Sequence, residues 1–156
     1  MGAGQGATDA DVVRARRLGE LVAREGWVLL TGGRNEGVMQ AANAGAKTVE
    51  GSLTIGILPT TSTVGVSPHV DVAICTGMGS ARNNINVLSS DVVMACGPGG
   101  PGTVSEIALA LKAGKPVIVI GADDAAQAFL TEVARGEITF ASSPEDAITQ
   151  AKEWLR

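Results

Sequence analysis

Apolar runs and helical patterns alternate along this chain at a regular pace. Runs rich in Val, Ile and Leu predict strands at 27–30, 54–58, 70–75, 92–96, 116–120 and 138–140. Between them, apolar residues three or four positions apart predict helices at 9–25, 37–48, 80–88, 107–113, 124–135 and from 144 onward. Strands that alternate with helices are typical of βαβ units. We therefore expect a single α/β domain over residues 1–156 with a parallel sheet.

The first seven residues hold a glycine pattern that no strand precedes. Met1–Ala7 fits Gly-x-Gly-x-x-Ala, the turn that follows the first strand of a dinucleotide-binding fold. We interpret this as a missing or truncated first strand, and we expect Ile/Val-rich codons upstream of Met1; a flexible N-terminal tail is the alternative. The next strand ends in Leu30-Thr31-Gly32 without the acidic residue that holds a ribose, so we expect neither NAD nor FAD.

The run Gly97–Glu106 carries the clearest chemical signal. It joins a predicted strand to a predicted helix, and Gly99, Gly100 and Gly102 let backbone N–H groups approach a ligand closely. Because a helix N-terminus adds partial positive charge, the run predicts an anion site, most commonly for a phosphate. No Gly-Lys-Ser/Thr follows, so magnesium-nucleotide chemistry is not implied. A plain connecting turn is the alternative.

Three glycine-bearing segments follow predicted strands and should meet at the carboxyl edge of the sheet, where open α/β sheets bind ligands. The candidate binding residues in these segments are Gly32, Gly33, Arg34, Gly79, Ser80, Arg82, Asn83, Gly99, Gly100, Gly102, Thr103 and Glu106.

Five polar positions in these segments have competing interpretations. Arg82 can clamp a phosphate with two parallel N–H bonds, or it is a surface arginine paired with a carboxylate. Thr103 and Glu106 fit a helix capping box, and Glu106 can also orient a ribose or act as a base. Asn83 and Asn86 are either ligands or ordinary polar helix residues.

Composition narrows the function classes. A net charge of −4 and few aromatic residues argue against nucleic-acid binding. The sequence shows no membrane-spanning stretch and no signal peptide, so we expect a soluble, cytoplasmic protein. Cys75 and Cys96 each end an apolar run and are expected to be buried and reduced. The single histidine, His69, lies in a predicted loop and cannot build a zinc site alone, so no metal site is predicted.

Pro98–Glu106 resembles the Pro-Gly-Gly-x-Gly-Thr-x-x-Glu motif of the Lonely Guy superfamily, long mislabelled "lysine decarboxylase". Thr31–Met39 and Gly79–Asn86 look most like the short branch of that superfamily that contains molybdenum cofactor carrier proteins. The resemblance covers nearly the whole chain from Gly2 onward. It implies a Rossmann-like, doubly wound parallel sheet and a homo-oligomer built from dimers, either a dimer or a tetramer.

The resemblance leaves two functions open. Enzymes of the superfamily hydrolyse nucleoside 5′-monophosphates to base and ribose 5-phosphate with an arginine and the glutamate of the motif, and Arg82 and Glu106 match those two positions. The enzymes usually carry Lys after the arginine and Glu-Glu at the end of the motif, where this chain has Asn83 and Ser105-Glu106. We therefore favour a carrier of a phosphorylated small molecule such as the molybdenum cofactor (molybdopterin). A nucleoside monophosphate phosphoribohydrolase is the alternative, and the missing first strand departs from both.

Overall fold

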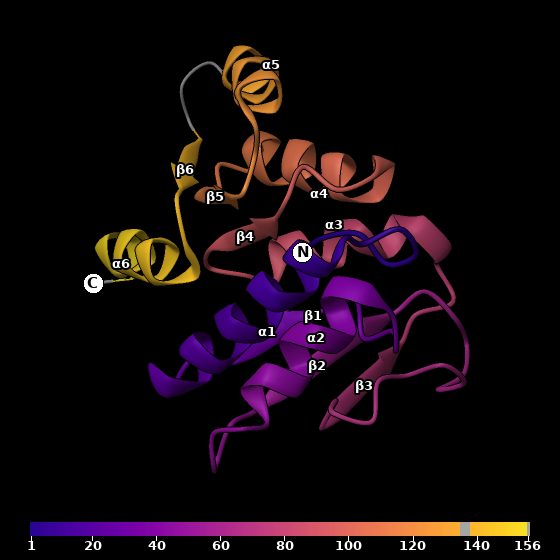
Figure 1. The fold of residues 1–156 in the computed structure, drawn as a ribbon. Helices are drawn as coiled ribbons and strands as arrows, with labels where there is room; N and C mark the ends of the chain where they lie inside the picture. Colours follow the sequence, from indigo (N-terminus) through magenta and orange to yellow (C-terminus); the bar gives the residue numbers. More distant parts are fainter. Residues whose placement is uncertain (135–137, 156) are drawn as a thin grey trace.

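The helices and strands of the computed structural model follow the predicted order (Figure 1). The structure describes residues 1–134 and 138–155. Within these ranges the elements are α1 (Asp9–Arg24), β1 (Leu29–Thr31), α2 (Gly37–Ala46), β2 (Thr54–Leu58), β3 (Val72–Cys75), the 3-10 turn η1 (Gly79–Arg82), α3 (Asn83–Leu88), β4 (Val93–Cys96), α4 (Pro101–Lys112), β5 (Val117–Ile120), α5 (Asp124–Ala134), β6 (Thr139–Ala141) and α6 (Pro144–Trp154). The predicted end of the fifth helix, at residue 135, lies outside the described residues.

Every strand pair in the described chain is parallel, as predicted. The strands form two separate three-stranded sheets, β1-β2-β3 and β4-β5-β6. At the N-terminus, Gly2 forms a parallel bridge with Cys96 of β4. The molecule has the expected Rossmann-like α/β fold, with its sheet divided between β1 and β4. Strand β1 was predicted at 27–30 and lies at Leu29–Thr31. Its pairing with β2 begins only at Leu29, whose N–H donates to the Leu53 oxygen.

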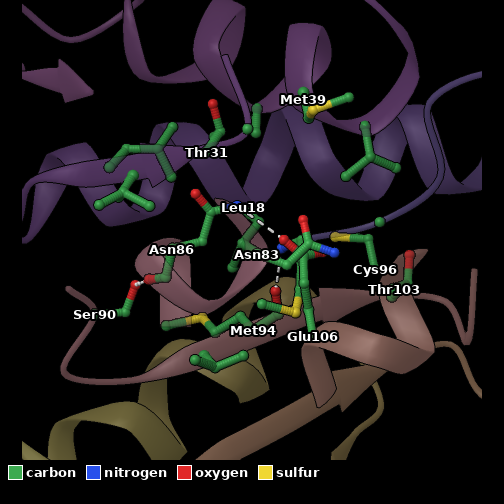
Figure 2. Close-up of a pocket in the computed structure, with 18 of the residues that line it drawn as sticks. Leu18, Thr31, Met39, Asn83, Asn86, Ser90, Met94, Cys96, Thr103 and Glu106 are labelled. Carbon is green, nitrogen blue, oxygen red and sulfur yellow. Dashed lines mark hydrogen bonds between the residues drawn. The ribbon is translucent and has the colours of Figure 1, made fainter. Parts of the chain in front are cut away.

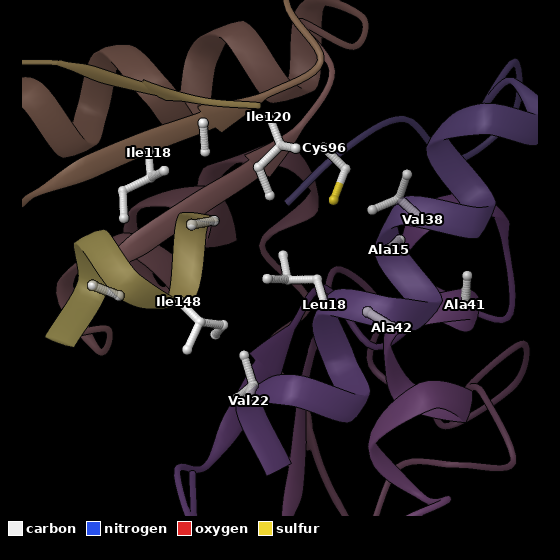
Figure 3. Close-up of a cluster of buried hydrophobic side chains, with 13 residues drawn as sticks. Ala15, Leu18, Val22, Val38, Ala41, Ala42, Cys96, Ile118, Ile120 and Ile148 are labelled. Atoms are coloured by element: carbon white, nitrogen blue, oxygen red, sulfur yellow. The ribbon is translucent and has the colours of Figure 1, made fainter. Parts of the chain in front are cut away.

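Helices cover both faces of the second sheet, which is the doubly wound arrangement. Ile118 and Ile120 of β5 point into a cluster shared with α1, α2 and α6, shown in Figure 3. Val117 and Val119 of the same strand point into a second cluster with α3, α4 and α5. Because side chains alternate along a strand, a strand buried on both faces must be apolar throughout. This explains the continuous apolar run that made β5 easy to predict.

Helices α1 and α2 pack unusually closely because each contributes a glycine to their contact. A Cβ on Gly19 would lie 2.0 Å from the Ala42 oxygen, and one on Gly45 would lie 1.8 Å from the Arg16 oxygen. No side chain fits at either distance. The N-terminal end of α1 lies beside the residue that follows β4, since a Cβ on Gly97 would lie 2.9 Å from Asp11 Oδ1.

The N-terminal segment is packed against α2, so the flexible-tail alternative is wrong. The Ala3 oxygen accepts a hydrogen bond of 3.0 Å from the Val38 N–H. A Cβ on Gly2 would lie 2.6 Å from Val38 Cγ1, so the glycine allows this close approach. The segment then enters α1, where Thr8 is the N-cap and forms a capping box with Asp11.

Two other local predictions need correction. The helix predicted at 80–88 begins later, because Ser80 lies inside η1 and α3 begins only at Asn83. Cys75 is exposed, because β3 is an edge strand with all four side chains exposed. Cys96 is free and buried as predicted, and burial raises the pKa of its thiol. Among the described residues, no helix is both long and apolar enough to span a membrane.

Candidate functional site

A cavity of about 910 Å³ lies between β1 and β4, and its lining includes the residues that follow their carboxyl ends (Figure 2). The three glycine-bearing segments do converge here. Eight of the predicted binding residues line the cavity: Gly32, Arg34, Arg82, Asn83, Gly100, Gly102, Thr103 and Glu106. The other four predicted residues, Gly33, Gly79, Ser80 and Gly99, do not line it.

Arg82 is the buried cation of the site, so the surface-arginine alternative is wrong. It lies where η1 meets α3, and only 8% of the residue is exposed. Its Nη1 donates to Asn83 Oδ1 at 3.0 Å and lies 3.6 Å from Glu106 Oε1. Burial lowers the pKa of the Arg82 guanidinium, and the Glu106 carboxylate opposes that shift. The guanidinium stays charged, since even a lowered arginine pKa leaves it protonated at neutral pH.

Gly32 allows the Arg82 guanidinium to lie against the end of β1. A Cβ on Gly32 would lie 2.6 Å from Arg82 Nη2. Gly32, which follows β1, therefore leaves room for the side chain of Arg82, which belongs to the segment after β3. Gly33 has a different role, since a Cβ there would lie 2.9 Å from the Gly56 Cα on β2. Gly33 therefore allows the turn after β1 to pack closely against Gly56 of β2.

Glu106 faces the cavity and does not cap its helix, so the capping-box interpretation of Thr103 and Glu106 is wrong. Helix α4 begins at Pro101, with Gly100 as N-cap and no hydrogen bond from a capping side chain. Proline is favoured at the first helical position, so the helix starts earlier than the apolar pattern suggested. Glu106 Oε1 instead accepts a hydrogen bond of 2.9 Å from Asn86 Nδ2.

Two buried polar atoms at the site lack a partner. Arg82 Nε and Asn86 Oδ1 are both inaccessible and make no hydrogen bond in the described chain. Buried polar groups in folded proteins are nearly always paired, so such atoms need an explanation. Both residues line the cavity, and one atom is a donor while the other is an acceptor. A polar ligand with both kinds of group is the simplest partner for the pair.

The glycine-rich run leaves open space at the N-terminus of α4. A Cβ on Gly100 or on Gly102 would meet no atom within 4 Å, and both residues line the cavity. Gly99 differs, because it has a φ of 60° and a Cβ there would lie 2.2 Å from Thr103 Oγ1. Gly99 therefore shapes the turn, while Gly100 and Gly102 keep side chains away from an uncapped helix N-terminus. Such an N-terminus favours an anion.

Arg34 lies at the rim of the cavity. Its Nη2 donates to Glu36 Oε2 at 2.6 Å, and 42% of its side chain is exposed. The Arg34 side chain is exposed and hydrogen-bonded directly to Glu36, whereas Arg82 is buried and has no hydrogen bond to Glu106, so Arg34 contributes less to an anion site than Arg82 does.

Sequence reasoning missed several residues that Figure 2 places around the cavity, namely Leu18, Thr31, Met39, Ser90, Met94 and Cys96. Thr31 is the last residue of β1, and its position at a strand end was a signal that could have identified it. Met94 lies within β4. No sequence signal pointed to it, because a residue inside a central strand is expected to be covered by a neighbouring strand. Asn86, which the sequence favoured slightly as an ordinary polar helix residue, lines the cavity and is buried beside Glu106.

The model of the SLOG cluster4 family matches residues 1–148. The chain belongs to the SLOG cluster4 family. A molybdenum cofactor binding protein from the phototrophic bacterium Rippkaea orientalis is 55% identical, with a TM-score of 0.96 over 100% of this chain and 94% of that one. The molybdenum cofactor carrier protein of Chlamydomonas reinhardtii is 48% identical, with a TM-score of 0.90 over 99% and 95% of the two chains.

An uncharacterized protein from Archaeoglobus fulgidus is 48% identical over 115 residues, which cover 73% of this chain and 74% of that protein. These comparisons confirm that this SLOG cluster4 protein resembles molybdenum cofactor carrier proteins in both sequence and fold.

Proposed function

We propose that this SLOG cluster4 protein binds the molybdenum cofactor in the cavity between β1 and β4 and acts as its carrier. The observation that carries this proposal is the pair of buried, unpartnered polar atoms, Arg82 Nε and Asn86 Oδ1, at one cavity wall. The names of the two similar solved proteins, a cofactor binding protein and a cofactor carrier protein, supply the chemical class of the ligand.

The residues fit a phosphorylated ligand. Arg82 offers a buried positive charge, and a guanidinium can bind a phosphate through two parallel N–H bonds. The uncapped N-terminus of α4 adds backbone N–H groups, and Gly100 and Gly102 keep the approach to them open. The phosphate end of the cofactor would therefore lie between Arg82 and the start of α4.

The acceptors beside Arg82 fit a heterocyclic ring. Asn86 Oδ1 is a free acceptor, and the Glu106 carboxylate has a second oxygen beyond the one bound to Asn86 Nδ2. A pterin ring carries N–H groups that such acceptors recognise, and unpaired ring donors would otherwise cost free energy on burial. Asn86 and Glu106 would thus select the ring, while Arg82 holds the phosphate.

Replacing Arg82 tests this assignment. The Arg82→Gln variant removes the buried charge but keeps a side chain that can hydrogen-bond Asn83. We expect it to bind the cofactor at least about tenfold more weakly, because charge-assisted hydrogen bonds contribute about 1.5–3 kcal/mol each. Arg16→Gln is the matched control, since Arg16 is exposed on α1 and does not line the cavity.

Binding is measured under anaerobic conditions with cofactor released from a purified molybdenum enzyme. Bound pterin and molybdenum are quantified after gel filtration. If Arg82→Gln, folded by circular dichroism, retains as much cofactor as Arg16→Gln does, the proposed phosphate site is wrong.

A phosphoribohydrolase is the second candidate, because Arg82 and Glu106 lie 3.6 Å apart in the same cavity. In that function Glu106 would stabilise the oxocarbenium-like centre that forms as a glycosidic bond breaks. The pair fits the carrier better. Asn86 holds one oxygen of Glu106, and the residue after Arg82 is the neutral Asn83, whose amide oxygen accepts from the guanidinium.

We also propose that the protein forms a homo-oligomer, a dimer or a tetramer, through β3. Val72 and Ile74 on this edge strand are each 45% exposed, and apolar side chains on an unpaired edge favour association. Multi-angle light scattering should give a mass of two or four chains. A single-chain mass at micromolar concentration would refute this.

A further inference from the structure

The Arg82 side chain is held by a neutral acceptor. Its Nη1 donates to Asn83 Oδ1 at 3.0 Å, and both residues are more than nine-tenths buried. The Glu106 carboxylate lies farther away, with Oε1 at 3.6 Å from the same Nη1, and accepts a hydrogen bond from Asn86. A carboxylate bonded directly to Nη1 would neutralise much of the guanidinium charge. The Asn83 amide occupies Nη1 without adding a negative charge.

The orientation of the Asn83 amide depends on Ser105 of α4. Asn83 Nδ2 donates to Ser105 Oγ at 2.9 Å, and Ser105 Oγ donates to the Gly102 oxygen at 2.7 Å. A serine hydroxyl has one proton, so a hydroxyl that donates to Gly102 can only accept from Asn83. The Nδ2 end of the amide must therefore face Ser105, and the Oδ1 end must face Arg82.

The bond to Asn83 uses only part of what the guanidinium can donate. Arginine carries five N–H donors in a planar fork, and an anion can bind two of them at once. Arg82 Nε makes no hydrogen bond within the described chain, and Nη2 lies against Gly32, where no side chain intervenes. Fixing Nη1 therefore restrains the guanidinium and leaves its other N–H groups for a ligand.

Ser105 itself lies outside the cavity. It is exposed on α4 and does not line the cavity, whereas Asn83 does line it and begins α3. Ser105 can thus act on a ligand only through Asn83 and Arg82. The three residues and the Gly102 carbonyl form a chain of hydrogen bonds from the buried cation to the first turn of α4.

We propose that Ser105 and Asn83 form a positioning pair, which fixes the Arg82 guanidinium and keeps its charge available to an anion. This inference rests on the proposed function and adds to that site a residue that the ligand does not touch. Ser105 orients the amide, the amide holds Nη1, and the remaining N–H groups bind the phosphate end of the ligand. Loss of an exposed hydroxyl on α4 should therefore weaken anion binding without weakening the fold.

Substitutions at position 105 test the proposal with inorganic phosphate as the probe. Ser105→Ala removes the acceptor for Asn83 and should weaken phosphate binding by about threefold to tenfold, as expected for one lost hydrogen bond. Ser105→Thr keeps the hydroxyl and should bind phosphate as the wild type does. Calorimetric titration measures the affinity, and urea unfolding checks the fold.

Thr149→Ala is the matched control. Thr149 is an exposed residue of α6 whose hydroxyl donates to the Glu145 oxygen of the same helix, and it does not line the cavity. Its loss should leave phosphate affinity unchanged. If Ser105→Ala binds phosphate as tightly as Thr149→Ala does, the proposal is wrong.

A double-mutant cycle separates positioning from a general effect on the structure. In an Asn83→Ala background, Ser105→Ala should change phosphate affinity by less than about twofold, because the amide through which Ser105 acts is gone. An equal loss of affinity in both backgrounds would overturn the proposal.

Nitrogen NMR of the Arg82 side chain gives a readout that needs no ligand. The bond to Asn83 should slow rotation of the guanidinium, so that Nη1 and Nη2 give separate signals in the wild type and in Ser105→Ala give one merged signal. Ser105→Thr should restore the separate signals. A wild type that binds no phosphate but shows this pattern would refute the proposed anion site and support the positioning role. Signals that Ser105→Ala leaves unchanged would overturn the positioning role even where phosphate binds.

Discussion

The Gly102→Val substitution should weaken ligand binding while leaving the fold nearly as stable. A Cβ at Gly102 meets no atom within 4 Å, and the residue is the second of helix α4, where an L side chain is unstrained. Glycine is about 1 kcal/mol less favourable than alanine inside a helix, and valine is intermediate. Gly102→Val should therefore change the free energy of unfolding by less than about 0.5 kcal/mol.

The same side chain should block the anion. Gly102 lines the cavity at the uncapped start of α4, where a phosphate needs close approach to backbone N–H groups. Loss of one charge-assisted hydrogen bond, about 1.5–3 kcal/mol, weakens binding by about tenfold to a hundredfold.

Calorimetric titration with the cofactor or with inorganic phosphate measures this effect, and urea unfolding checks the fold. Ala108→Val is the matched control, because it adds the same branched side chain at an exposed position of α4 outside the cavity. A folded Gly102→Val protein with wild-type affinity would refute the role given to the start of α4.

Three further outcomes are expected. After incubation of the protein with AMP, liquid chromatography should detect no free adenine. Adenine release by the wild type that the Glu106→Gln variant lacks would favour the hydrolase over the carrier. Gly19→Ala should lower the free energy of unfolding in urea by about 1–3 kcal/mol, because its Cβ would lie 2.0 Å from the Ala42 oxygen; an unchanged midpoint would contradict the close packing of α1 on α2. The Lys47 ammonium, bonded to Asp71, holds the pKa of that carboxyl below its usual value. The pair stabilises the folded state by only about 1 kcal/mol, because it is partly exposed. This contribution is present above about pH 4 and is lost as pH falls through the lowered pKa of Asp71. Asp71→Asn should remove this pH dependence of the unfolding free energy in acid, and an unchanged profile would contradict it.

The fold was predictable because its signals are local. Alternating apolar runs such as 116–120 mark strands buried on both faces, and Ser143 before Pro144 marks the start of α6. The convergence of the three glycine segments was also predictable, because parallel strands bring their carboxyl ends to one edge.

The remaining features depend on tertiary contacts that no local pattern encodes. Thr103 and Glu106 fit a capping box, yet Asn86, from a different helix, determines where the carboxylate points. Cys75 ends an apolar run but lies on a sheet edge, and strand order decides its exposure. The burial of Arg82 depends on the missing side chain of Gly32, fifty positions earlier in the sequence.

The central claim is that the cavity of this protein holds the molybdenum cofactor through Arg82. Native mass spectrometry of the wild-type protein, loaded under anaerobic conditions and desalted, tests it most directly. We predict an adduct with the mass of one cofactor per chain, which disappears in the Arg82→Gln variant and persists in Arg16→Gln. A wild-type spectrum that shows only the bare chain after loading would contradict the claim.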